Sequence, residues 1–304
     1  MDVAVIIAEY KCTLKTIGYA QNTIEQYRWG LEQFADYLEK AGIEDLRCVT
    51  RQLVVDYQAG LRQRPLAAET KAVLIRSVKR LFEHLTGKHL LLINPCEGIV
   101  EINRKQRPIG TVLTVRQMQR LLQQPNLSLR TGIRDRAMIE VFYATAIRCD
   151  ELVNLAVHDA DLKDNVLYIR KAKGGRQRVA PMGEAAAKYL KEYLEKIRPR
   201  HGRKNPKLRT LFLNHHGTGL TGNSIRAFLA GYRKSARIKK PITPHTLRRT
   251  CATHLLQGGA DIRFVQKLLG HKDIKTTQRY TRILPVEVKQ MHSATHPNAR
   301  KEKP

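Results

Sequence analysis

The sequence has few of the features that mark secreted, membrane-spanning or disulfide-stapled proteins. Its five cysteines are scattered and never occur as a C-x-x-C pair, which argues against a disulfide framework and a zinc module. A run of about 18 apolar residues is absent, so we expect no transmembrane helix and no membrane partner. Acidic residues flank the apolar patch near the N-terminus, and no small-residue cleavage site follows it, so a secretory signal is not expected either. These absences favour a reduced, cytoplasmic setting.

Acidic residues are scarce compared with basic ones. The chain has 55 Lys and Arg against 27 Asp and Glu, a formal charge of +28. Residues 1–107 hold 16 basic and 13 acidic residues, whereas the remainder holds 39 and 14. This asymmetry predicts a polyanionic partner for the C-terminal two-thirds, with nucleic acid as the default. Charge by itself leaves a plain basic surface as the alternative.

With 304 residues, of which 42% are hydrophobic, the chain is long enough for two folded domains. Its first part is patterned as helices. Residues 23–41 carry one apolar stripe at helical spacing. Thr23 and Gln26 form a capping-box pattern at the predicted start, and Gly42 is the predicted stop. Further helices are expected over 67–86, near 3–16 and over 50–61.

The periodicity lapses after the helical region, where prolines, glycines and basic residues gather. We therefore predict a helical domain over 1–94, a linker over 95–111, a second domain over 112–292 and a basic tail over 293–304. The linker holds a basic cluster that could cross a DNA backbone or simply be a solvated loop: Arg104, Lys105 and Arg107.

The second predicted domain, 112–292, mixes helices with a few strands. A helix is expected to start at Thr114 and another to cover 131–145. Two β-prone runs, 166–170 and 178–182, flank a Gly-Gly pair and predict a hairpin. Residues 210–214 suggest another short strand or an extended segment, and helices dominate from 221 onward. The expected fold is mainly α with a small antiparallel β-sheet in the catalytic domain.

Three short patterns near the C-terminus occur together. His245 and Arg248 are spaced i, i+3, so a helix places both on one face. A Leu-Gly-His sequence ends at His271, and Tyr280 follows nine positions later in a polar segment. Any one of these residues is more often structural than catalytic. The spacing of all three patterns together is strong evidence for a catalytic site, whereas each pattern by itself is weak evidence.

At these residues the chain resembles the tyrosine site-specific recombinases, or phage-type integrases, and among them the Xer-type enzymes. The sequence around Arg148 and Glu151 is similar to the family's first-arginine motif, and the hairpin pattern K-G-x-x-x-R aligns Lys173 with the family's lysine. One departure is Ala146, where the family usually has glycine. The resemblance spans nearly the whole chain and implies a helical core-binding (SAM-like) domain followed by a mixed α/β catalytic domain.

The resemblance implies that Tyr280 is the nucleophile, forming a 3′-phosphotyrosyl link and freeing a 5′-hydroxyl. Lys173 would protonate the leaving oxygen, and His245 would act as base or proton relay for a phenol whose ordinary pKa of about 10 makes it a poor nucleophile. Strand exchange would proceed through a Holliday junction.

The remaining site residues would handle the phosphate. Arg148 and Arg248 present forked donors to its oxygens, His271 adds a hydrogen bond, and Glu151 holds a cationic or imidazole neighbour in place. Contacts with the DNA backbone are expected from three further arginines: Arg176, Arg178 and Arg249, the last of which could instead be structural.

No cofactor and no metal are expected, because the chain has neither a P-loop nor a two-metal carboxylate cluster, and its other histidines lack ligand spacing. The implied partners are a double-stranded DNA recombination site and a homo- or hetero-tetramer assembled on it, with a possible partner recombinase. A type IB topoisomerase-like relaxing enzyme and a non-catalytic DNA-binding regulator are the rival functions. Chromosome-dimer resolution and integration or excision of a mobile element share these motifs.

Overall fold

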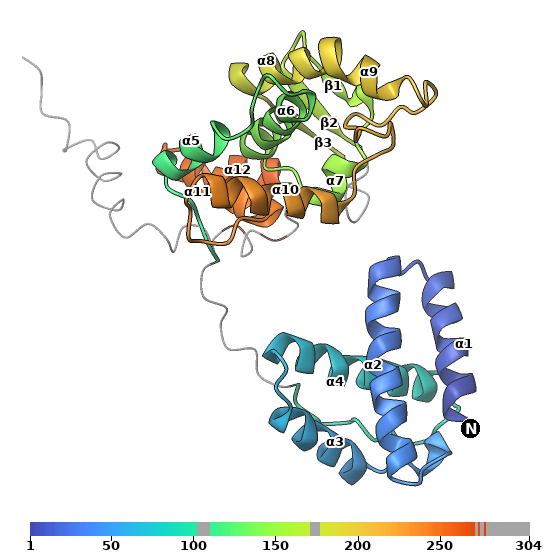
Figure 1. The fold of residues 1–304 in the computed structure, drawn as a ribbon. Coiled ribbons are helices and arrows are strands. Elements are labelled where there is room, and N and C mark those ends of the chain that lie inside the picture. The colour runs from blue at the N-terminus through green and yellow to red at the C-terminus, as the bar shows by residue number, and fades with distance from the viewer. Residues whose placement is uncertain (102–109, 171–176, 271–272, 274–276, 278–304) are drawn as a thin grey trace, which may run out of the picture. The chain divides into compact units, whose positions relative to one another are not determined.

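The computed structural model describes residues 1–101, 110–170, 177–270, 273 and 277. The chain divides into two compact units, Met1–Arg107 and Pro108–Pro304 (Figure 1). The division falls inside the predicted linker. None of the helices in the described ranges is long and apolar enough to cross a bilayer.

The first unit is built from four α-helices. They are α1 (Val3–Thr16), α2 (Gln21–Lys40), α3 (Arg51–Gln63) and α4 (Ala68–Gly87), with a short 3-10 turn, η1 (Leu46–Cys48). Helices α2 and α4 pack closely, because Gly30 presents no side chain where α4 brings Ser77 against it. Their apolar stripes meet in a core where the rings of Phe34 and Phe82 lie 6.3 Å apart, edge to face.

The predicted helices of the first unit are confirmed, but the predicted cap of α2 is wrong. The helix begins at Gln21, so Thr23 lies inside its first turn and cannot accept a capping hydrogen bond there. Ala20 precedes the helix without a side-chain cap. The first two helical residues, Gln21 and Asn22, are exposed, and the Gln21 side-chain amide donates to Glu25 Oε1 at 2.9 Å, one turn later.

The second unit is mainly helical around a small sheet. Its helices are α5 (Val115–Leu122), α6 (Arg130–Thr145), α7 (Cys149–Val153), α8 (Glu184–Glu192), α9 (Arg198–Gly202), α10 (Gly222–Ser235), α11 (Pro244–Gln257) and α12 (Ile262–Leu269), with single turns η2 (Val157–Asp159) and η3 (Tyr193–Ile197). Helix α6 is the centre of this unit: it is buried on nearly every side and packs against α8 and α11.

The sheet has three antiparallel strands in the order β1-β2-β3: β1 (Ala160–Asp161), β2 (Val166–Ile169) and β3 (Arg178–Pro181). Leu167 pairs with Ala180, and both side chains are buried in the core. The predicted fold class and the two hairpin strands are therefore confirmed. Of the two possibilities for 210–214, the short strand is not formed: the segment makes isolated bridges, such as Ala156 with Thr210, and joins no sheet.

Candidate active site

Helix α11 places two of the predicted catalytic residues. Thr243 accepts a hydrogen bond from the Thr246 N–H at 3.2 Å, and Pro244 occupies the first helical position, where a missing N–H costs nothing. The helix start is thereby fixed. His245 follows at its exposed end and Arg248 lies almost one turn later.

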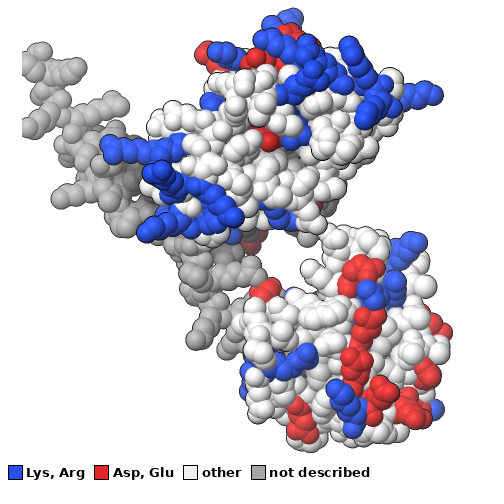
Figure 2. Space-filling model, in the orientation of Figure 1, with Lys and Arg blue, Asp and Glu red and all other residues white. Residues whose placement is uncertain are grey.

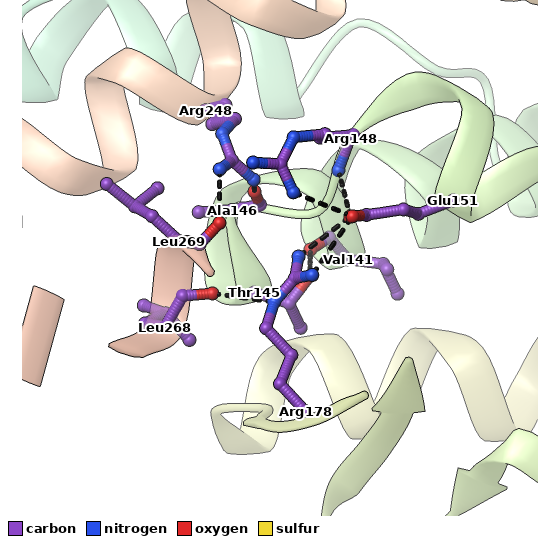
Figure 3. A network of polar contacts seen from close by, with 9 residues as sticks. All are labelled: Val141, Thr145, Ala146, Arg148, Glu151, Arg178, Arg248, Leu268 and Leu269. Atoms are coloured by element: carbon purple, nitrogen blue, oxygen red, sulfur yellow. Dashed lines mark hydrogen bonds and ion pairs between the residues drawn. The ribbon is translucent and has the colours of Figure 1, made fainter. Parts of the chain in front are cut away.

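Arg248 is buried, with only 3% of its surface exposed. Its Nη1 donates to the carbonyl of Ala146, and its Nη2 donates to the carbonyl of Leu269 (Figure 3). These contacts join three segments that are far apart in the sequence: α11, the turn after α6 and the end of α12. A buried guanidinium held by carbonyl dipoles keeps its charge and a fixed direction.

The turn after α6 depends on the residue that departs from the family pattern. Ala146 has φ +49° and is in the left-handed conformation, which glycine adopts without strain. For alanine this conformation costs about 1–2 kcal/mol. The turn directs the Ala146 carbonyl to Arg248 and leads directly to Arg148, so the strain lies at the site itself.

Arg148 is held by Glu151 at the start of α7. The Arg148 backbone N–H donates to Glu151 Oε2 at 2.9 Å, and Arg148 Nη1 donates to Oε1 at 2.8 Å. The Arg148 side chain is 25% exposed, whereas that of Glu151 is 2% exposed. The predicted support by Glu151 of a cationic neighbour therefore matches the contact observed.

Arg178, which the sequence suggested as a DNA contact, points into the protein. Its Nη1 and Nη2 donate to the two Glu151 oxygens at 3.0 and 2.7 Å, and its Nε donates to the Leu268 carbonyl at 2.8 Å. Burial raises the pKa of Glu151, but the hydrogen bonds from Arg178 and Arg148 prevail and hold it at about 2. Sequence spacing gave no signal for this ion pair, because its two residues lie 27 positions apart.

His245 lies within the field of these arginines. Desolvation lowers the pKa of its imidazole, and repulsion by Arg248, Arg249 and Arg148 lowers it further. The ring is therefore neutral at neutral pH and able to accept a proton. Arg249 packs so closely on Gly110 that a Cβ there would clash with its guanidinium, which favours the structural alternative for this residue.

Several predicted site residues lie outside the described residues: Lys173, Arg176, His271, Tyr280, Arg104, Lys105 and Arg107. Their roles stay predictions. Within the described ranges, no group of His, Cys, Asp and Glu is arranged to hold a metal ion. Of the other histidines, His254 instead bonds through Nδ1 to the Tyr143 hydroxyl at 2.8 Å and through Nε2 to the Leu113 carbonyl at 2.9 Å. His201 is buried.

The chain matches the models of a known family over most of its length. Residues 111–286 match the phage integrase family, and residues 7–89 match the N-terminal SAM-like domain of phage integrases. The chain belongs to the phage integrase family. This membership agrees with the pairing of a helical unit and an arginine-rich mixed unit.

Curated relatives of the chain are tyrosine recombinases. The chain is 39% identical over 285 residues to tyrosine recombinase XerD of Listeria monocytogenes serotype 4b (strain F2365), a match that covers 93% of this chain and 95% of that protein. The chain is therefore a site-specific tyrosine recombinase.

Solved structures share its fold. The Tn1549 transposon integrase in complex with circular intermediate DNA has a TM-score of 0.71 at 21% identity, covering 92% of this chain and 95% of that one. The XerH site-specific recombinase bound to palindromic difH substrate has a TM-score of 0.71 at 22% identity, covering 91% and 80%.

Proposed function

We propose that this recombinase cleaves and rejoins double-stranded DNA at a specific site through a covalent link between Tyr280 and a 3′-phosphate. The observation that carries the proposal is the meeting of Arg148 and Arg248: the carbonyl of Ala146, two residues before Arg148, accepts a hydrogen bond from Arg248. Figure 3 shows both guanidiniums side by side in one network of polar contacts. Two permanently charged, forked donors suit the non-bridging oxygens of one phosphodiester.

The arginines act on the transition state. Attack by a phenolate oxygen on phosphorus concentrates negative charge on the non-bridging oxygens, and each pre-positioned donor lowers the barrier by about 3–4 kcal/mol. Arg248 is held by backbone carbonyls and Arg148 by Glu151, so neither must reorganise during the reaction. His271 is the further donor in this proposal.

Proton transfers complete the reaction. The phenolic oxygen of Tyr280 bonds to phosphorus while the bond from phosphorus to the 5′-oxygen breaks. The phenol proton passes to His245, whose lowered pKa keeps the imidazole neutral and ready to accept it. Lys173 gives a proton to the departing 5′-oxygen. Attack by the 5′-hydroxyl of a second duplex reverses these steps, so the reaction needs no energy cofactor and no metal.

The charge distribution supports DNA as the substrate. Acidic and basic side chains are interspersed on the visible face of the first unit, whereas Lys and Arg predominate on that of the second (Figure 2). No Asp or Glu occurs in the sequence between Glu195 and Asp261. Phosphate contacts should therefore dominate affinity and make binding strongly salt-dependent. The DNA-bound Tn1549 integrase and XerH structures add support. Exchange between two duplexes implies four active sites, and hence a tetramer assembled on DNA.

A suicide-substrate assay tests the proposal. The recombination site is first mapped by footprinting on genomic DNA of the source organism, and a nicked duplex carrying it is incubated with the full-length protein. We expect a protein–DNA adduct that survives SDS, forms equally well in EDTA, and is absent with the Tyr280→Phe variant. That variant loses only one hydroxyl, so its DNA affinity should be unchanged.

The assay also separates the rival functions. Absence of an adduct with a bound duplex would identify a non-catalytic regulator. Relaxation of supercoiled DNA that lacks the mapped site would indicate a topoisomerase-like enzyme. Loss of cleavage on chelation would exclude the metal-independent mechanism.

A further inference from the structure

The guanidinium of Arg178 is fully engaged inside the protein. Three of its N–H groups donate to the Leu268 carbonyl and to both oxygens of Glu151, at 2.7–3.0 Å (Figure 3). Its side chain is only 8% exposed. All three guanidinium nitrogens of Arg178 therefore donate to acceptors within the protein, two of them to a carboxylate that neutralises its charge.

The carboxylate of Glu151 is shared between two arginines. Oε1 accepts from Arg148 Nη1 as well as from Arg178, and Oε2 accepts from the Arg148 backbone N–H as well as from Arg178. One negative charge thus faces two positive charges. A Glu151–Arg148 pair by itself would be neutral. The group formed by Glu151, Arg148 and Arg178 instead keeps one net positive charge.

We infer that Arg178 is a positioning residue for strand cleavage, which it supports through Glu151 and not through contact with DNA. It fixes the Glu151 carboxylate from the side opposite Arg148, so that Arg148 is held in one direction. It also offsets the charge of Glu151, so that the guanidinium of Arg148 stays available to the phosphate. This inference rests on the proposed function.

Arg178 also stabilises the end of α12, which holds Arg248. Its Nε–H bonds the carbonyl of Leu268, and the neighbouring carbonyl of Leu269 accepts from Arg248. Gly270, at φ +61°, lies against the same side chain: a Cβ there would be 3.4 Å from Cδ and Nη1 of Arg178. The side chain therefore contacts the supports of both Arg148 and Arg248.

The electrostatics agree with this geometry. Burial raises the pKa of Glu151, and the hydrogen bond from Arg178 is the largest influence that lowers it. The residue therefore stays ionised at 2% side-chain exposure. Removing Arg178 would leave a buried carboxylate with one cationic partner in place of two.

The test compares Arg178→Gln with wild type in single-turnover cleavage of the nicked duplex at saturating enzyme, together with equilibrium DNA binding. Removing an outer partner of an active-site group typically costs 10–100-fold, and we expect the cleavage rate to fall by about that factor. DNA affinity should change by less than about twofold, because all three guanidinium nitrogens already donate to acceptors within the protein. Arg178→Lys keeps the positive charge but loses the forked pair of Nη donors. Its cleavage rate should therefore lie between those of wild type and Arg178→Gln.

A double-mutant cycle separates action through Glu151 from a general structural role. In the Glu151→Gln background, adding Arg178→Gln should change the cleavage rate by less than about twofold, because the shared partner is already lost. The double variant also replaces a buried ion pair by two neutral amides. It therefore provides a folded reference if Arg178→Gln by itself unfolds.

Arg170→Gln is the matched control. Arg170 follows β2, bonds Asp159 Oδ1 at 2.8 Å and is 51% exposed, so its loss removes the same charge without touching Glu151. Its cleavage rate should stay within about twofold of wild type. Equal rate losses in the two arginine variants, multiplicative losses in the cycle, or weaker DNA binding at an unchanged rate would each overturn the inference. If wild type forms no Tyr280-dependent adduct, the proposed function fails instead.

Discussion

The two units of the chain bury different kinds of side chain. In the described part of the first unit, the buried polar residues are uncharged: Gln58 and Ser77. The second unit also buries charged ones: Arg134, Asp135, Glu140, Glu151, Asp159 and Arg248. Both units have apolar cores, so they differ in whether charged side chains are buried as well.

Buried charges are costly, so their location is informative. Taking an ion out of water costs several kcal/mol, which only well-placed partners repay. Glu151 and Arg248 meet this cost where the proposed function places the DNA phosphate. Asp135 pairs with Arg134 at 2.7 Å near the opposite end of α6, which is a structural use. The first unit depends instead on close apolar packing. Mutations in the second unit should therefore act through its buried charges, and mutations in the first unit through its apolar packing.

The largest effect is expected from Arg248→Gln. Loss of one transition-state donor of this type lowers the cleavage rate by about 10²–10³-fold. The measurement is single-turnover cleavage at saturating enzyme. DNA affinity, measured in parallel, should fall much less because many other phosphate contacts remain. A folded variant that cleaves within about tenfold of wild type would place Arg248 among the structural charges.

Asp135→Asn tests the structural charges. The variant leaves Arg134 buried without its carboxylate and disturbs the hydrogen bond of 2.9 Å that the Tyr232 hydroxyl donates to Asp135. We expect the free energy of unfolding to fall by about 3–5 kcal/mol, because one partner of a buried pair is removed. Denaturant unfolding of the full chain measures this change.

The control for this variant is the exposed Asp164→Asn, which should stay within about 0.5 kcal/mol of wild type. Asp135 lies about 15 Å along α6 from its C-terminal end, so cleavage by the folded variant should be preserved. A loss of cleavage without a loss of stability would contradict the division between structural and catalytic charges.

The smallest effect is expected from Gly30→Ala in the first unit. The added methyl would meet Ser77 of α4, with its Cβ at 2.8 Å, and force α2 and α4 apart. Overpacking of this kind costs about 1–3 kcal/mol, seen as an earlier unfolding transition of the helical unit. Gly60→Ala in α3 is the matched control: nothing lies within 4 Å of that position, so the variant should gain up to about 1 kcal/mol from helix propensity. Equal effects at both glycines would show that the helix crossing is not tightly packed.

Local patterns in the sequence were sufficient for much of the fold. Apolar residues at helical spacing predicted α1 to α4, and the β-prone runs beside the Gly-Gly pair predicted β2 and β3. Patterns failed where tertiary contacts decide. The Thr23–Gln26 pair resembles a cap, but α2 begins two residues earlier, at the exposed Gln21. The β-prone run 210–214 has no complete partner strand, so it makes only isolated bridges.

The sequence by itself determined the family, the mostly helical architecture and the residue types of the site, because periodicity and motif spacing are local properties of a chain. Tertiary structure decided which charges meet. Only folding brings Arg178 to Glu151 across 27 positions and Arg248 to the Ala146 carbonyl across 102. It also made Arg178 an internal support, since a side chain's exposure depends on what packs over it and not on its own chemistry.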